Sequence, residues 1–342
     1  NVKDAVQTRP VNGIADELEP DPNQGAGSDD DYQKFITARI GPVKLAEQDW
    51  REKTTTNYVL NAGLTWNVLK NLDVKSVFTS EQGYGKNLRF YGPDTGESFN
   101  NGGSAPLGEQ TKNNTTSYRW YNTIAYRVKD QGQHKLDFLV GQEISSTGGS
   151  EDFIRSEDFR NSITPDELFA NMQLGRTDRI YTRNYIETNR FSLFGRGNYM
   201  FNDKYIATVT FRSDVSSIFA KGNRVGYFPA LALGWKMSQE NFMQNIKFVN
   251  DLKMRVSYGT TGNDGVNAGA AQNLFAASTL RGPGWGNVDN VYYTPNSTVL
   301  YNPDLVWERT IQRNLGFDFT VANSRISGTL DVYWNTANDL LL

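Results

Sequence analysis

Cysteine is absent from this sequence, and histidine occurs only once among its 342 residues. Without cysteine there can be no disulfide framework, thiolate metal site or cysteine nucleophile. No run of about 18 apolar residues occurs, which excludes a membrane-spanning helix. The net charge is only −3, and basic residues are dispersed among acidic ones, so nothing indicates a nucleic-acid partner.

Residue patterns for catalysis are also scarce. His134 stands beside a predicted tight turn, so a histidine-dependent triad has no support. Phosphate-binding loops, nucleophile elbows and zinc-ligand spacings do not occur. The acidic pairs Glu151-Asp152 and Glu157-Asp158 fall in a predicted long loop, where we expect them to be solvated. We therefore predict a protein that is not an enzyme and has no catalytic residues, metal site or cofactor.

What the sequence does contain is a strict alternation of apolar and polar residues. Tyr205, Ala207 and Val209 alternate with Thr208 and Thr210, and a period of two predicts strands with one apolar and one polar face. Hydrophobic residues make up only 38% of the chain but aromatic residues 13%, which suits strands with one apolar face. About ten strands follow this pattern, in the stretches 58–68, 72–78, 118–128, 136–140, 191–201, 205–211, 231–235, 252–258, 311–321 and 326–334.

The hairpin connections provide a test of this assignment. Directly paired residues of an antiparallel hairpin share a face, so strands whose apolar positions have the same parity need an odd-length turn. Three-residue turns are predicted at 69–71, 131–133 and 202–204, and a two-residue turn at Asn323-Ser324, where the parity changes. All four turns contain Asn, Asp or Gly, the residues that tight hairpins favour.

The remaining connections are long, roughly 81–115, 142–189, 213–228 and 260–309. Short turns that alternate with long loops are typical of a transmembrane β-barrel, in which strands of about 10 residues cross the apolar band. We predict an all-β, antiparallel transmembrane barrel with short periplasmic turns and long extracellular loops. Residues 1–56 would form an extracellular loop and irregular lead-in, and residues 57–342 the barrel strands and loops. A soluble β-sandwich has the same alternation and remains an alternative.

Several motifs occur together in the second half of the chain. Arg212-x-Asp214 is followed by Ser216-Ser217, then by Gly226-Tyr227-Phe228-Pro229. Further motifs follow in the order SYG at 257–259, GND at 262–264 and NPxLxWE at 302–308. As a set they resemble the C-terminal barrel half of SusC/RagA-type TonB-dependent outer-membrane transporters. One departure is Val215, where that family usually carries glycine.

The resemblance implies a 22-stranded barrel closed by an N-terminal plug, in the outer membrane of a Gram-negative bacterium. Such proteins import large nutrients, typically oligosaccharides and less often peptides. TonB supplies the energy through the plug, and a SusD-like surface lipoprotein covers the mouth. Ten strands cannot close such a barrel, and we find no plug, TonB box or signal sequence. We therefore expect a part of a longer protein.

Substrate contacts are expected from the long loops and from one motif. Aromatic rings stack on sugar faces, so Phe90, Tyr91, Trp285, Tyr292 and Tyr293 are candidates. Asn263 and Asp264, in the GND motif, are candidates for hydrogen bonds to substrate. Two other functions remain open, a soluble carbohydrate-binding module and a passive outer-membrane porin.

Overall fold

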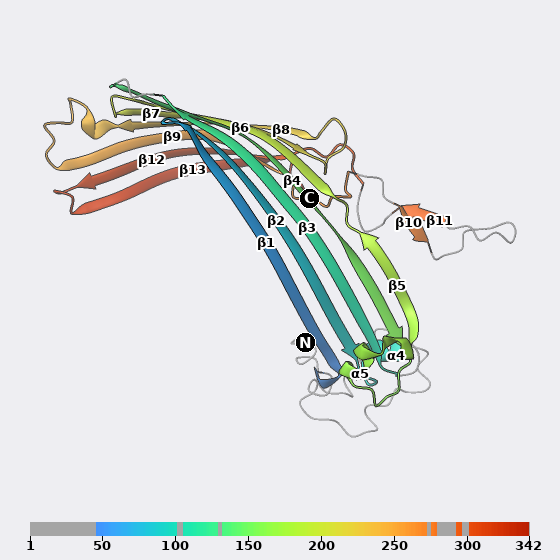
Figure 1. The fold of residues 1–342 in the computed structure, drawn as a ribbon. Helices are drawn as coiled ribbons and strands as arrows, with labels where there is room; N and C mark the ends of the chain where they lie inside the picture. The colour runs from blue at the N-terminus through green and yellow to red at the C-terminus, as the bar shows by residue number, and fades with distance from the viewer. Residues whose placement is uncertain are drawn as a thin grey trace. The chain divides into compact units, whose positions relative to one another are not determined.

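The computed structural model describes residues 46–100, 105–128, 132–271, 275–278, 292–295 and 301–341, the two four-residue segments by backbone only. Its main feature is an antiparallel sheet of 11 strands (Figure 1). Ten of them are hydrogen-bonded in the order β1-β2-β3-β4-β6-β7-β8-β9-β12-β13, and β5 pairs with β4. A second sheet contains β10 and β11. The all-β prediction is thus confirmed, and the ten-strand path matches the ten predicted strands.

The strands of the large sheet have the following bounds: β1 Asp49–Leu69, β2 Leu72–Tyr91, β3 Leu107–Arg127, β4 His134–Glu157, β5 Arg176–Asn184, β6 Thr188–Phe201, β7 Tyr205–Ser216, β8 Val225–Lys236, β9 Val249–Asn263, β12 Glu308–Val321 and β13 Ile326–Asn338. The small sheet has β10 Phe275–Ser278 and β11 Tyr292–Pro295. The helices are α4 Gly96–Asn100 and α5 Pro165–Ala170, with short 3₁₀ turns at Met172–Leu174 and Met237–Gln239.

Strand length is where the sequence-based prediction was wrong. β1 to β4 have 20 to 24 residues, about twice the predicted length. The predicted loops 81–115 and 142–189 lose most of their length to β2, β3, β4 and β5. Stretches such as 111–116 (TKNNTT) and 145–151 (SSTGGSE) are polar on both faces, so they show no apolar alternation. Backbone ladder bonds form regardless of side-chain type, so these strands exist without that signal.

The predicted hairpin registers agree with the structure. Phe201 pairs with Tyr205 around the three-residue turn 202–204. In the last hairpin the Arg325 amide donates to the Ala322 carbonyl, which places Asn323-Ser324 in the two central positions. Both have positive φ (55° and 63°), as type I′ hairpin turns require. The structure also agrees with the predicted turns after β1 and β3. The hydrogen bonds from Asn61 to Thr79 and from Val128 to Leu136 each join residues that are equally far from the centre of the predicted turn.

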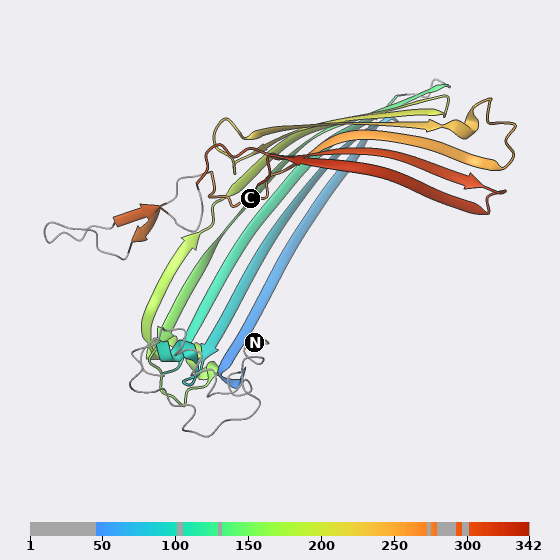
Figure 2. The same ribbon diagram turned by 180° about the vertical axis from the view of Figure 1, so that it is seen from behind.

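The chain divides into two compact units, which are described separately. Unit 1 comprises residues 1–58, 82–116 and 149–185. In its described part, Phe90, Phe159, Ile163, Leu168 and Met172 form a small buried core. Figures 1 and 2 show α4 and α5 at the same end of this unit.

Helix α5 begins with a capping box that explains why so short a segment is helical. The Glu167 amide donates to Thr164 Oγ1, and the Thr164 amide donates to the Glu167 carboxylate. Pro165 at the first turn suits the helical φ and needs no amide hydrogen bond there. The helix thereby places Leu168 in the core with no exposed surface.

Unit 2 comprises residues 59–81, 117–148 and 186–342. It contains β6 to β9, β12 and β13, together with segments of β1 to β4. Its buried cluster is small, with Phe219, Phe228 and Trp307 at its centre. The predicted boundary between lead-in and barrel, residue 57, lies inside β1, which begins at Asp49. The lead-in before residue 46 lies outside the described residues, so the division at 57 stays a prediction.

Candidate functional site

The sheet of unit 2 has one apolar face, and its apolar residues line up across strands. One row runs Ala207–Leu233–Val256–Leu315–Val332 over five consecutive strands. Leu330 and Val332 on β13 are more than half exposed, and so are Leu60 and Trp66 on β1. Apolar surface on this scale is far larger than a soluble monomer exposes. Such a face fits contact with lipid, as on the outside of a membrane barrel.

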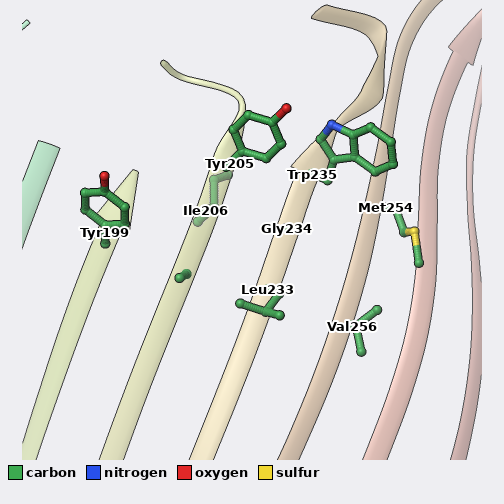
Figure 3. A pocket seen from close by; sticks show the side chains of 9 residues that line it. Tyr199, Tyr205, Ile206, Leu233, Gly234, Trp235, Met254 and Val256 are labelled. Carbon is green, nitrogen blue, oxygen red and sulfur yellow. The ribbon is translucent and has the colours of Figure 1, made fainter. Parts of the chain in front are cut away.

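A shallow depression of about 500 Å³ lies on this face (Figure 3). Tyr199, Leu233 and Val256 are among the residues that line it. At its end the Tyr205 hydroxyl and the Trp235 indole both donate to Glu240, at 2.7 and 3.1 Å. Rings with an apolar body and an anchored polar tip are typical of a membrane interface. The depression is therefore a poor candidate for substrate binding.

The opposite face of the unit 2 sheet is polar and hydrogen-bonded across strands. Arg255 on β9 donates two hydrogen bonds of 2.9 Å to Asp318 on β12 and also reaches Asp331 on β13. Across β7, β6 and β4, the Thr208 hydroxyl donates to the Asn198 side chain, whose amide donates to Asp137. Thr208 thus lies on the face that the alternation of residues predicted to be polar.

The family motifs of the sequence meet at the ends of β6 to β9 and β12. Phe219, Phe228 and Trp307 pack their rings at 5.4 to 5.5 Å, and Trp307 Nε1 donates to the Arg224 carbonyl. Beside them the Asp264 carboxylate accepts two hydrogen bonds from Arg190 and one from Ser216 Oγ. We call these six side chains, Arg190, Ser216, Phe219, Phe228, Asp264 and Trp307, the motif cluster.

Two glycines of the motifs are explained by the Phe228 ring. A Cβ atom on Gly226 or Gly262 would overlap that ring, so only glycine lets the backbone approach it. The GYFP and GND motifs are thus parts of one packing arrangement. Packing alone therefore explains why these motif residues, far apart in the sequence, have these identities, and no contact to a substrate is needed.

In unit 1 the Arg155 side chain is buried among acidic residues and is only 8% exposed. Carboxylate oxygens of Glu97, Glu109 and Asp178 lie 3.0, 3.4 and 3.5 Å from its guanidinium. Burial raises the pKa of Glu109, which the Arg155 and Arg89 charges oppose. A buried arginine surrounded by three acids is a structural ion network rather than an open binding site.

Phe90 and Tyr91, two of the predicted substrate contacts, end strand β2 rather than lying in a loop. Both are buried, Phe90 in the core of unit 1 and Tyr91 under the Arg89 guanidinium at 4.3 Å. Burial, together with the negative charge of Glu109, raises the pKa of Tyr91 to about 12. Neither ring face is open to a ligand in this structure.

The other predicted contacts belong to unit 2, and the structure describes the side chains of only two of them. Asp264 belongs to the motif cluster, and the adjacent Asn263 accepts a hydrogen bond from the Gly265 amide. Tyr292 and Tyr293 lie on β11, for which only the backbone is described, and Trp285 lies outside the described residues. Of the four candidates whose side chains the structure describes, Phe90 and Tyr91 belong to unit 1 and Asn263 and Asp264 to unit 2, and the role of all seven in binding stays a prediction.

The structure also shows a group of partly exposed rings that the sequence-based prediction missed. Phe153 on β4 and Tyr181 on β5 stack at 5.0 Å, and Tyr185 follows just after β5. Glu151, expected as a solvated loop acid, instead lies on β4 and accepts hydrogen bonds from Tyr181, Arg183 and Tyr185. The spacing of Tyr181, Arg183 and Tyr185 by two residues is a strand signal that could have identified them.

Within the described part of the chain, no helix combines the length and the apolar character needed to cross a membrane. In the same residues, no group of three or more acidic or histidine side chains is arranged to hold a metal ion.

Comparison with known proteins identifies the family. The model of the family described as "TonB dependent receptor-like, beta-barrel" matches residues 6–342. This chain belongs to that family. Its members are β-barrel transport proteins of the outer membrane, which agrees with the exposed apolar face. The predicted resemblance to SusC/RagA-type receptors is confirmed.

Named relatives support the same assignment. TonB-dependent receptor SusC of Bacteroides thetaiotaomicron is 33% identical over 242 residues, which cover 66% of this chain and 22% of that protein. TonB-dependent receptor P26 of Formosa agariphila is 32% identical over 231 residues, 67% of this chain and 22% of that protein. The fold is similar to the structure of the RagAB peptide transporter, with a TM-score of 0.76 at 23% identity over 88% of this chain and 32% of that one. The chain thus spans a third or less of the length of these relatives.

Proposed function

We propose that this chain contributes to the TonB-dependent active import of a large nutrient across the outer membrane. The observation that carries the proposal is the two-faced sheet of unit 2 in a chain of this family. Its apolar face suits lipid, and its polar face would line the conduit. Import would depend on gating rather than on bond chemistry. A plug would leave the barrel path when TonB acts on it.

The partners follow from the family. We infer that TonB binds a plug segment outside this chain and that a SusD-like lipoprotein covers the extracellular mouth. Similarity to the SusC receptor and to the RagAB transporter supports this inference. The most fitting substrate is an oligosaccharide, and a peptide is the less favoured choice.

Energised uptake by whole cells tests the proposal. The full-length protein is expressed in a host that lacks the gene, and entry of a fluorescent oligosaccharide is followed with and without a protonophore. We expect uptake that stops when the protonophore is added and when TonB is deleted. Uptake that persists under both conditions would favour the passive porin instead and would refute active import.

The two alternatives predict different behaviour. A porin would conduct ions steadily in planar bilayers even when the full-length protein carries its plug. A soluble carbohydrate-binding module would stay monodisperse in buffer without detergent. The exposed rows of Leu, Val and Trp on one face argue against the soluble form, because water would face hundreds of Å² of apolar surface.

A further inference from the structure

Three aromatic side chains occur together on β4, on β5 and just after β5 in unit 1, namely the half-buried Phe153 and the more exposed Tyr181 and Tyr185. Phe153 and Tyr181 are directly paired residues of the two strands, so they lie on the same face. Their rings stack with an interplanar angle of 17°. Tyr185 lies four residues beyond Tyr181, about 13 Å along an extended chain. Both tyrosines are 37% exposed.

Hydrogen bonds from neighbouring side chains hold the two tyrosine rings in place. The Glu151 carboxylate accepts a 3.2 Å hydrogen bond from each tyrosine hydroxyl. Arg183, paired with Glu151 across the strands, forms a 2.9 Å ion pair with it. The Arg183 guanidinium lies 6.0 Å from the Tyr181 ring and 5.9 Å from the Tyr185 ring. The rings are therefore ordered before any ligand arrives, which lowers the entropy lost on binding.

We propose that Phe153, Tyr181 and Tyr185, which we call the aromatic platform, bind a neutral oligosaccharide. The proposal rests on the proposed function and names residues that would contact its substrate. Sugar rings present polarised C–H groups that pack on the electron-rich faces of aromatic rings. Their hydroxyls can reach Arg183, which is 60% exposed.

Local charge favours a neutral ligand. Beside the platform, the opposite charges of Glu151 and Arg183 form an ion pair with each other, so this pair offers no free counter-charge to an anionic or a cationic ligand. The platform side chains offer ring faces, which suit a sugar, whereas a peptide would instead use the edge of β5 that pairs with no other described strand. Neutral sugar is therefore the ligand that the observations favour, and a peptide is an outcome that the test can detect.

Binding by the purified full-length protein in detergent tests the proposal. The probes are neutral hexasaccharides of glucose, mannose and xylose, with a neutral decapeptide as the rival ligand, all measured by calorimetry. Because no energy source is present, the result does not depend on active import, so failure of binding and failure of import can be told apart. The variants are Tyr181→Ala, Tyr185→Ala, Tyr181→Phe and, as a matched control, Tyr84→Ala.

We expect at least one hexasaccharide to bind and each alanine variant of the platform to weaken it about tenfold. Tyr181→Phe keeps the ring and loses only the bond to Glu151, so its affinity should stay within about threefold. Tyr84 is an exposed ring of unit 1 that contacts Tyr58, outside the platform, and its loss should change nothing. Absence of hexasaccharide binding, binding of the decapeptide alone, or equal losses for Tyr84→Ala and Tyr181→Ala would each overturn the proposal.

Discussion

A substitution of Asp264 can show whether the motif cluster stabilises the fold or binds substrate. Its side chain is 14% exposed and receives hydrogen bonds of 2.6 and 3.1 Å from Arg190. A third bond, of 2.8 Å, comes from the fully buried Ser216 hydroxyl. The Ser216 oxygen also accepts from the Ile218 amide, so Asp264 holds the start of the loop after β7. We predict that Asp264→Asn loosens that loop.

The expected magnitude follows from the geometry. Asparagine has only one side-chain oxygen, so it can accept a hydrogen bond from Arg190 or from Ser216 but not from both in the same geometry. Its NH₂ group would then point at the other residue, which is also a donor. Hydrogen bonds to charged groups contribute about 1.5–3 kcal/mol each. Because Arg190 is 41% exposed, water replaces part of what it loses. We therefore expect the opening free energy of this region to fall by about 2 kcal/mol, roughly a 30-fold faster exchange.

Hydrogen exchange of the full-length protein in detergent measures this change. The informative amides are Ser216, which donates to the Arg224 carbonyl, and Ile218. Asp304→Asn is the matched control because Asp304 is an exposed carboxylate on a nearby connection. The same two proteins are then compared for ligand binding.

Two results would refute this account. One is unchanged exchange at Ser216 and Ile218 in the Asp264→Asn protein. The other is equal acceleration in the Asp304→Asn control. If exchange were unchanged while ligand affinity fell, Asp264 would be a substrate contact, as its sequence motif first indicated.

Three further predictions concern single sites. Gly262→Ala places a Cβ against the Phe228 ring and should cost about 1–3 kcal/mol, seen as a lower temperature of unfolding on heat-modifiability gels; an unchanged temperature would contradict the packing. Leu233→Lys puts a charge on the lipid-facing surface and should cost about 2–4 kcal/mol in urea titrations in bilayers, where a neutral result would argue against lipid contact. Tyr91→Phe should remove a phenol that titrates near pH 12 in difference absorbance. Burial and Glu109 disfavour its phenolate, so its contribution to stability is complete below pH 10.0 and is lost as the pH rises toward 12; retention of that late titration in the variant would assign it elsewhere.

The sequence predicted the strands of unit 2 well because each has one face that needs an apolar environment. Tyr205, Ala207 and Val209 show this alternation, and the structure pairs them with Trp235, Leu233 and Leu231. Hairpin registers could be predicted for the same reason, since a shift of one residue would turn every apolar side chain toward the polar face.

The polar ends of β1 to β4 could not be predicted in this way. Stretches within them, such as 111–116 and 145–151, have polar side chains on both faces, so the residue types there carry no period. Glu151 and Phe153 show the consequence: they were assigned to a loop, although they lie on a 24-residue strand. The prediction of substrate contacts was affected most. Phe90 and Tyr91 were predicted to be loop aromatics, but they are buried at the end of β2.

By itself the sequence determined the strand pattern, the two chemically distinct faces and the family, because these depend on the order of apolar and polar residues along the chain. Only the tertiary structure decided which distant residues meet. Asp264 reaches Arg190 across 74 positions, and Trp307 reaches Arg224 across 83. The physical reason is that a contact between strands depends on pairing and register through space. Neither the motif cluster nor the aromatic platform is therefore visible in any single stretch of sequence.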